Sequence, residues 1–348
     1  MTLASKHPLA LALALALLAG CSDSLTTTTD SLGGDDDSRS AQETPADDDS
    51  DDGSQDDGPS VLDAGRAGSS RDGGSASRTP DASTPSDDAP SDGADSDAGD
   101  DPPASGGGRT LPPVTSVDGN GPFAVTIDQN VGPNRGWVVR PTDLGKDGIK
   151  HPIFIWGAGA GTNASNYRDH LSRWASHGFV IEGHASTGSA RDHKGALDWL
   201  VAENGRQGSP YYQKLDVSKV AFGGHSQGSI STFAASDDAR ITTTIHVAGG
   251  SFDGMGGGKL KKPTAYLCGQ TDTSATNNAN RDYTGTKVPV FMTVMNGINH
   301  IYAAREGLPA STAWLRWWLA GETERKEQFI GASCEYCKGK YVSKSKNW

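Results

Sequence analysis

The chain has 348 residues and a formal net charge of −12, but the charge is divided unevenly along its length. Residues 22 to 108 contain 23 Asp and Glu, four arginines and no aromatic residue. Such a segment cannot bury enough apolar surface to offset chain entropy, so we predict a disordered, self-repelling linker. From Arg109 onward, 26 Lys and Arg face 20 acidic residues. This part is long enough for one good-sized domain, and we expect no nucleic-acid partner.

The first 21 residues are typical of an export signal. Lys6 provides a short positive start, and residues 8 to 19 form an apolar run too short to span a bilayer comfortably as a mature helix. The run ends in LAGC, residues 18 to 21, which resembles the lipobox at which bacterial lipoproteins are cleaved and lipidated. An ordinary secretory signal with an incidental cysteine is the alternative.

These features predict three parts of the chain. They are a signal peptide over residues 1–20, a lipidated Cys21 with the acidic linker over residues 21–112, and a folded domain over residues 113–348. Ser22 differs from the aspartate that retains many lipoproteins at the inner membrane. We therefore expect an exported monomer that meets the outer membrane or cell surface only through its lipid anchor.

Beyond the linker, short apolar runs alternate with helical patterns. The predicted strands are Pro122–Ile127, Gly136–Arg140, Pro152–Trp156, Phe179–Glu182, Lys219–Gly223, Thr242–Val247, Thr264–Cys268 and Val288–Met295. The predicted helices are Ser165–Ser176, Asp192–Ala202, Gln227–Ala235 and Ala310–Leu319. The alternation predicts an α/β fold with a doubly wound, mostly parallel sheet and helices on both faces. The first two strands have no helix between them and suit an antiparallel edge.

GGHSQGS, residues 223 to 229, contains the G-x-S-x-G pattern of a nucleophile elbow. The pattern is short enough to occur by chance, but here a predicted strand precedes it and a predicted helix follows it, as an elbow requires. Gly224 and Gly228 lack the bulk that would crowd the strained backbone of the serine between them. Ser226 is therefore the candidate nucleophile.

A serine hydroxyl needs a base, and the base needs an orienting carboxylate. In hydrolases of this topology the chain order is serine, acid, histidine. After Ser226 only two histidines remain. His246 falls inside a predicted strand, whereas His300 follows the last predicted strand on a loop, where this kind of sheet places its base.

Three aspartates compete for the role of the acid. Asp272 stands just past the predicted strand Thr264–Cys268, whereas Asp253 lies in a glycine-rich stretch and Asp282 in a polar run without a preceding strand. Position favours Asp272.

An oxyanion needs two backbone N–H donors. One is expected from Gln227, and the other from the loop GAGAGT, residues 157 to 162. This loop lacks the Gly-Lys-Ser/Thr of a phosphate-binding loop, and Thr162 replaces the last glycine of a dinucleotide fingerprint. A plain tight turn is the alternative, and we expect no metal or organic cofactor.

From about Gly121 to Cys337 the chain resembles the bacterial cutinase and PET-hydrolase-like branch of the α/β-hydrolases, which is related to the dienelactone hydrolases. The matching stretches are GPFAV, GAGAGTNASNYRDHLSRWASHGFV, GGHSQG, PTAYLCGQTD, NGINH and AWLRWWLAGETERKEQFIGASC. The resemblance implies Ser226, Asp272 and His300 as the catalytic triad. It also implies Gln227 and a loop residue as oxyanion donors, and the shared GTNAS stretch places that residue at Gly159, with Ala160 as the nearest rival.

The resemblance also bears on the substrate. His225 matches a histidine before the nucleophile in many cutinases, and it either contacts substrate or is a packing or solvent-facing residue. Polyester hydrolases of this family usually carry an aromatic residue where Gly159 stands and a Trp after the sixth strand, a place for which Phe252 is the candidate. Aromatic side chains hold the aromatic rings of such polyesters. Because this chain has fewer of them at these positions, we expect inefficient hydrolysis of aromatic polyesters.

We therefore expect a serine carboxylic-ester hydrolase that works through an acyl-enzyme on an ester substrate, polymeric or lipid among the candidates. A non-catalytic envelope lipoprotein and a peptidase on the same fold are the alternatives.

Cys334 and Cys337, spaced as C-E-Y-C, predict a short structural disulfide, since no second ligand pair for zinc lies near them. Cys268 lies in an apolar run and predicts a buried free thiol. The tryptophans at 314, 317 and 318 are at helical spacing and predict core.

Overall fold

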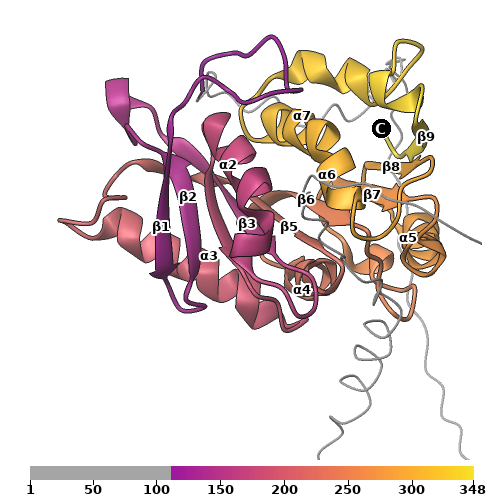
Figure 1. Ribbon diagram of the computed structural model, residues 1–348, viewed down its shortest axis with the longest axis horizontal. Coiled ribbons are helices and arrows are strands. Elements are labelled where there is room, and N and C mark those ends of the chain that lie inside the picture. Colours follow the sequence, from indigo (N-terminus) through magenta and orange to yellow (C-terminus); the bar gives the residue numbers. More distant parts are fainter. Residues whose placement is uncertain (1–110) are drawn as a thin grey trace, which may run out of the picture. The chain divides into compact units, whose positions relative to one another are not determined.

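A nine-stranded sheet runs through residues 111–348, the part of the chain that the computed structural model describes (Figure 1). The predicted signal peptide, Cys21 and nearly all of the acidic linker lie outside these residues. The strands are β1 (Val125–Val131), β2 (Gly136–Pro141), β3 (His151–Gly157), β4 (Val180–His184), β5 (Leu215–His225), β6 (Ile241–Val247), β7 (Thr264–Gly269), β8 (Val290–Met295) and β9 (Tyr341–Lys346).

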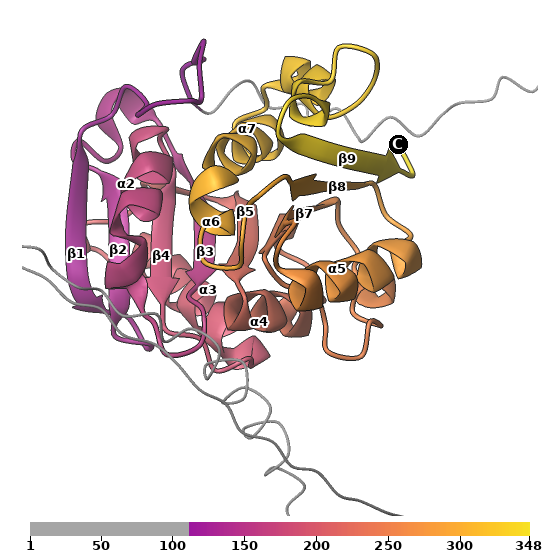
Figure 2. The ribbon, with the colours of Figure 1, turned by 45° about the vertical axis from the view of Figure 1, so that its right-hand side comes forward.

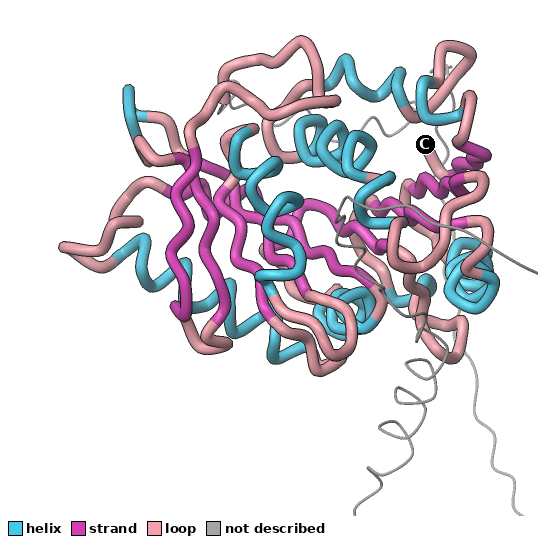
Figure 3. The backbone as a smooth tube through the Cα atoms, viewed as in Figure 1, coloured by secondary structure: helices cyan, strands magenta, loops and turns pink. Residues whose placement is uncertain are grey.

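The sheet order is β1-β2-β4-β3-β5-β6-β7-β8-β9. Neighbours from β4 to β8 pair in parallel, whereas β1, β2 and β9 pair antiparallel at the two edges. Figure 3 shows the strands as one layer between the helices. The predicted doubly wound, mostly parallel α/β fold and its antiparallel first edge are confirmed.

Helices cover both faces of the sheet (Figure 2). The α-helices are α2 (Arg168–Ser176), α3 (Ala190–Gly205), α4 (Gln227–Ala235), α5 (Thr273–Gly285), α6 (Ala303–Glu306) and α7 (Leu308–Trp318). Short 3-10 turns are η1 (Lys146–Gly148), η2 (Ala164–Tyr167), η3 (Gly257–Lys259), η4 (Thr323–Gln328) and η5 (Glu335–Cys337). One apolar core joins α2, α6 and α7 to the sheet, and two others join α3, α4 and α5 to the opposite face.

Helices α5 and α6 and strand β9 could not be predicted from the sequence, and α6 is only four residues long. The run of α5 is mostly polar, and only four residues of one stripe are buried, namely Thr276, Ala279, Asp282 and Tyr283. Strand β9 reads YVSKSK, which has no apolar run, but it pairs with β8 along its whole length. A sheet edge facing solvent tolerates lysines, which also oppose edge-to-edge aggregation.

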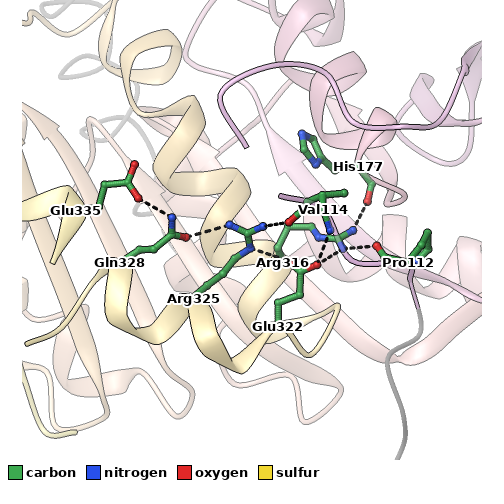
Figure 4. Close-up of polar contacts among 8 residues, drawn as sticks. All are labelled: Pro112, Val114, His177, Arg316, Glu322, Arg325, Gln328 and Glu335. Carbon is green, nitrogen blue, oxygen red and sulfur yellow. Dashed lines mark hydrogen bonds and ion pairs between the residues drawn. The ribbon is translucent and has the colours of Figure 1, made fainter. Parts of the chain in front are cut away.

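A buried ionic cluster holds the start of the described chain against the C-terminal helices (Figure 4). We call Arg316, Glu322 and Arg325 the arginine clamp; their exposed fractions are 0%, 1% and 6%. Glu322 accepts from both guanidinium groups, with 2.5 Å between its Oε2 and Nε of Arg325. The arginines also donate to three backbone carbonyls, those of Pro112 at 2.6 Å, Val114 at 2.6 Å and His177 at 2.8 Å.

The remaining predictions on the C-terminal part are confirmed except at Trp318, which is half-buried against the core. Cys334 and Cys337 form a disulfide, and Cys268 is free and buried. Trp314 and Trp317 are buried in the core, where Trp317 stacks on Phe329. Within residues 111–348, no helix has both the length and the apolar character needed to cross a membrane.

Candidate active site

The turn between β5 and α4 has the geometry of a nucleophile elbow. Ser226 lies between them with φ 53° and ψ −113°, a conformation that a non-glycine residue adopts only under strain. A Cβ on Gly224 would lie 2.3 Å from the carbonyl carbon of Gly228, and one on Gly228 would lie 1.9 Å from the carbonyl oxygen of Gly157. Both flanking positions of the motif therefore require glycine.

Ser226 is the residue before α4, so Gln227 is the first residue of that helix. The N–H groups of a first helical turn have no acceptor within the helix. The backbone N–H of Gln227 therefore has no acceptor within the helix, and its role as an oxyanion donor stays a prediction.

His300 and Asp272 lie together although 28 residues separate them in the chain. Nδ1 of His300 lies 2.7 Å from Oδ2 of Asp272. The Asp272 side chain is 8% exposed and that of His300 is 34% exposed, so the carboxylate is shielded while the imidazole reaches solvent. Asp272 also accepts from the backbone N–H of Ala275 at 3.2 Å as the cap of α5.

Ser226, Asp272 and His300 follow β5, β7 and β8, which run parallel in the sheet. Carboxyl ends of parallel strands meet at one edge, where open α/β sheets bind their ligands. The fold thus places all three predicted residues on loops at the same edge.

The rival candidates lie elsewhere or have other partners. His246 is buried between the rings of Phe233 and Tyr266, and burial lowers its pKa to about 3. Asp253 is exposed and accepts from the backbone N–H of Met255. A buried imidazole that stays neutral and an exposed loop carboxylate both suit structural roles.

Asp282, the third rival, is buried on α5 and shapes the loop after β6. It accepts from the backbone N–H of Ser251 at 2.5 Å, from its hydroxyl at 2.6 Å and from the backbone N–H of Gly257 at 3.1 Å. This role could not be predicted from the sequence, because the run that forms α5 is mostly polar. Asp282 therefore holds the segment that carries Phe252.

The loop after β3 differs from the sequence expectation at Gly159. Its backbone N–H donates to the hydroxyl of Tyr167 at 3.1 Å, and the residue is buried. A donor already engaged in this way does not face an oxyanion. Ala160, the rival position, is only half-buried, and its N–H is the better candidate for the second donor.

His225 is 5% exposed, and both of its ring nitrogens have partners. Nδ1 lies 2.8 Å from the hydroxyl of Tyr167, and Nε2 lies 2.9 Å from the backbone oxygen of His300. Neither nitrogen is left for a substrate, so the geometry corrects the expected substrate contact in favour of a packing role. Tyr167 itself was not predicted, since no sequence spacing links it to a partner 58 residues away.

Two loops at this edge expose large apolar side chains. Phe252 is 51% exposed and Met255 66%, both on the loop after β6. Ile301 is 59% exposed and Tyr302 52%, directly after His300. We call these four residues the apolar rim; the other exposed large hydrophobics within residues 111–348 are Val217, Val342 and Trp348.

Across residues 111–348, no group of three or more His, Cys, Asp or Glu side chains is arranged to hold a metal ion. A family model described as PET hydrolase-like matches residues 109–347. No curated protein matches the chain.

Proposed function

The chain belongs to the PET hydrolase-like family of α/β-hydrolases, and on that premise we propose that it cleaves carboxylic esters with Ser226, His300 and Asp272 as its triad. The observation that carries the proposal is the 2.7 Å contact between His300 Nδ1 and Asp272 Oδ2 on the edge of the sheet that carries Ser226. A carboxylate on Nδ1 orients the imidazole and leaves Nε2 to take a proton.

In the first half of the reaction, Ser226 Oγ attacks the ester carbonyl carbon while His300 Nε2 takes its proton. The negative charge that develops on the carbonyl oxygen is stabilised by the N–H groups of Gln227 and Ala160. The carbon–oxygen bond to the alcohol then breaks, and His300 returns its proton to the leaving alcohol. Water repeats the sequence on the acyl-enzyme, releasing the acid and restoring Ser226.

Hydrolysis of short p-nitrophenyl esters by the full chain tests this proposal. Ser226→Ala should lower kcat by about 10⁶-fold relative to the wild type, because removing a triad serine leaves only binding and oxyanion stabilisation. Ser218→Ala, which changes an exposed serine on the strand that leads to Ser226, is the matched control and should keep full activity. Equal activity of wild type and Ser226→Ala would exclude Ser226 as the nucleophile.

The apolar rim supports an ester with large apolar groups, such as an aliphatic polyester or a lipid. Scattered exposed hydrophobics are normal, but four on two loops at the edge of the sheet that carries Ser226 indicate a contact surface. Met255→Ser with Ile301→Ser should slow hydrolysis of an ester film or emulsion several-fold and leave soluble p-nitrophenyl acetate nearly unchanged. Val342→Ser, which removes an equally exposed hydrophobic on β9, is the control. Equal losses on soluble and insoluble esters would argue against a surface role of the rim.

We propose further that the enzyme is an exported monomer, lipidated on Cys21, with the acidic segment as a spacer. The LAGC sequence and the charge of residues 22 to 108 support this. Incorporation of labelled palmitate that is lost in Cys21→Ser would test the anchor, and release of a soluble wild-type protein into the medium would count against it.

A further inference from the structure

Tyr167 and His225 form a hydrogen-bonded chain that touches all three parts of the candidate active site. The backbone N–H of Gly159 donates to the Tyr167 hydroxyl at 3.1 Å. That hydroxyl lies 2.8 Å from His225 Nδ1, and His225 Nε2 lies 2.9 Å from the backbone oxygen of His300. The chain therefore runs from the oxyanion loop, past the residue next to Ser226, to the loop of the base.

The direction of each hydrogen bond follows from the chemistry of its partners. The carbonyl of His300 only accepts, so Nε2 of His225 must carry a proton. Burial lowers the pKa of His225 to about 4, with the nearby His300 adding to it, so the ring is neutral near pH 7 and its Nδ1 is an acceptor. The Tyr167 hydroxyl accordingly accepts a hydrogen bond from Gly159 and donates one to His225. Each donor and acceptor in this series of hydrogen bonds then has a partner.

The chain is built into the packing around it. The rings of His225 and His300 have centroids 4.7 Å apart, and Tyr167 packs edge-on against Trp156 of β3 at 5.7 Å. A Cβ on Gly159 would lie 3.0 Å from Nδ1 of His225 and 3.2 Å from the Tyr167 hydroxyl. The close approach of these two side chains thus explains a glycine at this position of the loop.

We infer that Tyr167 and His225 are positioning residues for ester hydrolysis, which lock the loop of His300 and the loop of Ala160 to the nucleophile elbow. The inference rests on the proposed function. His225 is covalently joined to Ser226 and bonded to the backbone of His300, so it sets the distance between nucleophile and base. Tyr167 holds the residue before Ala160, so it sets the direction of the second oxyanion donor.

The loss of this chain should affect rate more than binding, because misplacing catalytic groups by about 1 Å costs up to about 10²-fold in rate. We expect Tyr167→Phe to lower kcat for p-nitrophenyl butyrate about 10- to 100-fold, with KM within about twofold of wild type. Phosphonylation of Ser226 by a fluorophosphonate, in which the serine oxygen bonds phosphorus and fluoride leaves, should slow in the same proportion. Tyr211→Phe is the matched control, because it removes a buried hydroxyl that donates to Asp128, away from the site.

Two substitutions of His225 test the chain independently of Tyr167. His225→Gln retains an N–H donor for the His300 carbonyl, whereas His225→Leu retains none. The glutamine variant should therefore keep more of kcat than the leucine variant, and Tyr167→Phe combined with His225→Leu should be no slower than His225→Leu alone. Melting temperatures of all variants separate loss of positioning from loss of folding, and His225→Gln decides the matter if Tyr167→Phe does not fold.

Wild-type kcat in Tyr167→Phe, or the same kcat loss in Tyr211→Phe, would overturn the positioning role while leaving the proposed function intact. Multiplicative losses in the double variant would also overturn it, since members of one chain act as a unit. A wild type that neither hydrolyses esters nor reacts with the fluorophosphonate would overturn both proposals.

Discussion

The arginine clamp and the Asp272–His300 pair each centre on one carboxylate, but they differ in exposure and in the number of partners that the carboxylate has. In the clamp, Glu322 is 1% exposed between two buried guanidinium groups, which also bind backbone carbonyls. In the candidate active site, Asp272 is shielded but His300 remains 34% exposed. The buried cluster holds chain segments together, whereas the half-open pair keeps one nitrogen available for a proton.

This pairing keeps the carboxylate of Glu322 charged although it is buried. Burial would raise the pKa of Glu322, but hydrogen bonds from Arg316 and Arg325 outweigh it and hold the pKa below its usual value. Breaking a buried pair by removing one partner costs more than the pair contributes in total, because the remaining charge is left uncompensated. Substitutions in the clamp should therefore lower the stability of the folded protein, whereas substitutions in the active site should lower the catalytic rate.

Asp272→Asn should have the largest effect and only on catalysis. We expect kcat to fall about 10⁴-fold, because the amide no longer selects the imidazole tautomer that the reaction needs. The melting temperature should stay near the wild-type value, since Asn still caps α5. Ester kinetics and thermal denaturation measure the two effects, and Asp253→Asn is the control; a greater loss in the control would move the role of the acid to Asp253.

Glu322→Gln should have the opposite signature. Two buried arginines would lose their common counter-charge, and we expect the free energy of unfolding to fall by about 3–5 kcal/mol. Below the melting temperature, kcat should remain close to wild type. Asp237→Asn, which breaks an exposed pair with Lys194, should change stability by less than about 1 kcal/mol. Chemical denaturation compares the variants, and an unchanged midpoint for Glu322→Gln would contradict the clamp.

Acid should weaken the folded protein in a defined order. Burial lowers the pKa of His177 to about 4, with Arg316 nearby adding to it, and lowers that of His246 to about 3. The unfolded chain binds protons on these histidines near pH 6.5 while the folded chain does not, so stability falls as pH drops from about 6.5 toward 4.

The pKa of Glu322 is also lowered in the folded protein, from an ordinary value of 4.5. Its protonation therefore continues the loss of stability at pH values below 4.5. Melting curves between pH 8 and pH 3 would show this decline, and His177→Gln should flatten its upper part. A melting temperature that stays constant down to pH 4 would exclude neutral burial of these histidines.

The Cys334–Cys337 disulfide should have the smallest effect. It closes a very short loop, so the chain-entropy contribution is about 2 kcal/mol or less. The double variant Cys334→Ala/Cys337→Ala should melt a few degrees lower with unchanged kcat. Thermal denaturation with and without reductant measures it, and a loss as large as that of Glu322→Gln would mean that the disulfide, not the clamp, holds the C-terminal segment.

Most of the fold and the candidate catalytic residues could be predicted because their signals are local. The G-x-S-x-G pattern lies within five residues between a strand and a helix, and His300 and Asp272 follow recognisable apolar strands. Strand β9 and helix α5 escaped because their polar residues face solvent, and only pairing with β8 and a narrow buried stripe reveal them.

The sequence by itself determined the α/β order, the elbow at Ser226 and the order of acid and histidine, since each depends on neighbours along the chain. Only the tertiary structure decided that Gly159 donates to Tyr167, that His225 is fully bonded, and that Arg316 and Arg325 share Glu322. These contacts join residues up to 75 positions apart through hydrogen bonds no longer than 3.1 Å. Such bonds depend on side-chain directions after packing, which no local pattern contains.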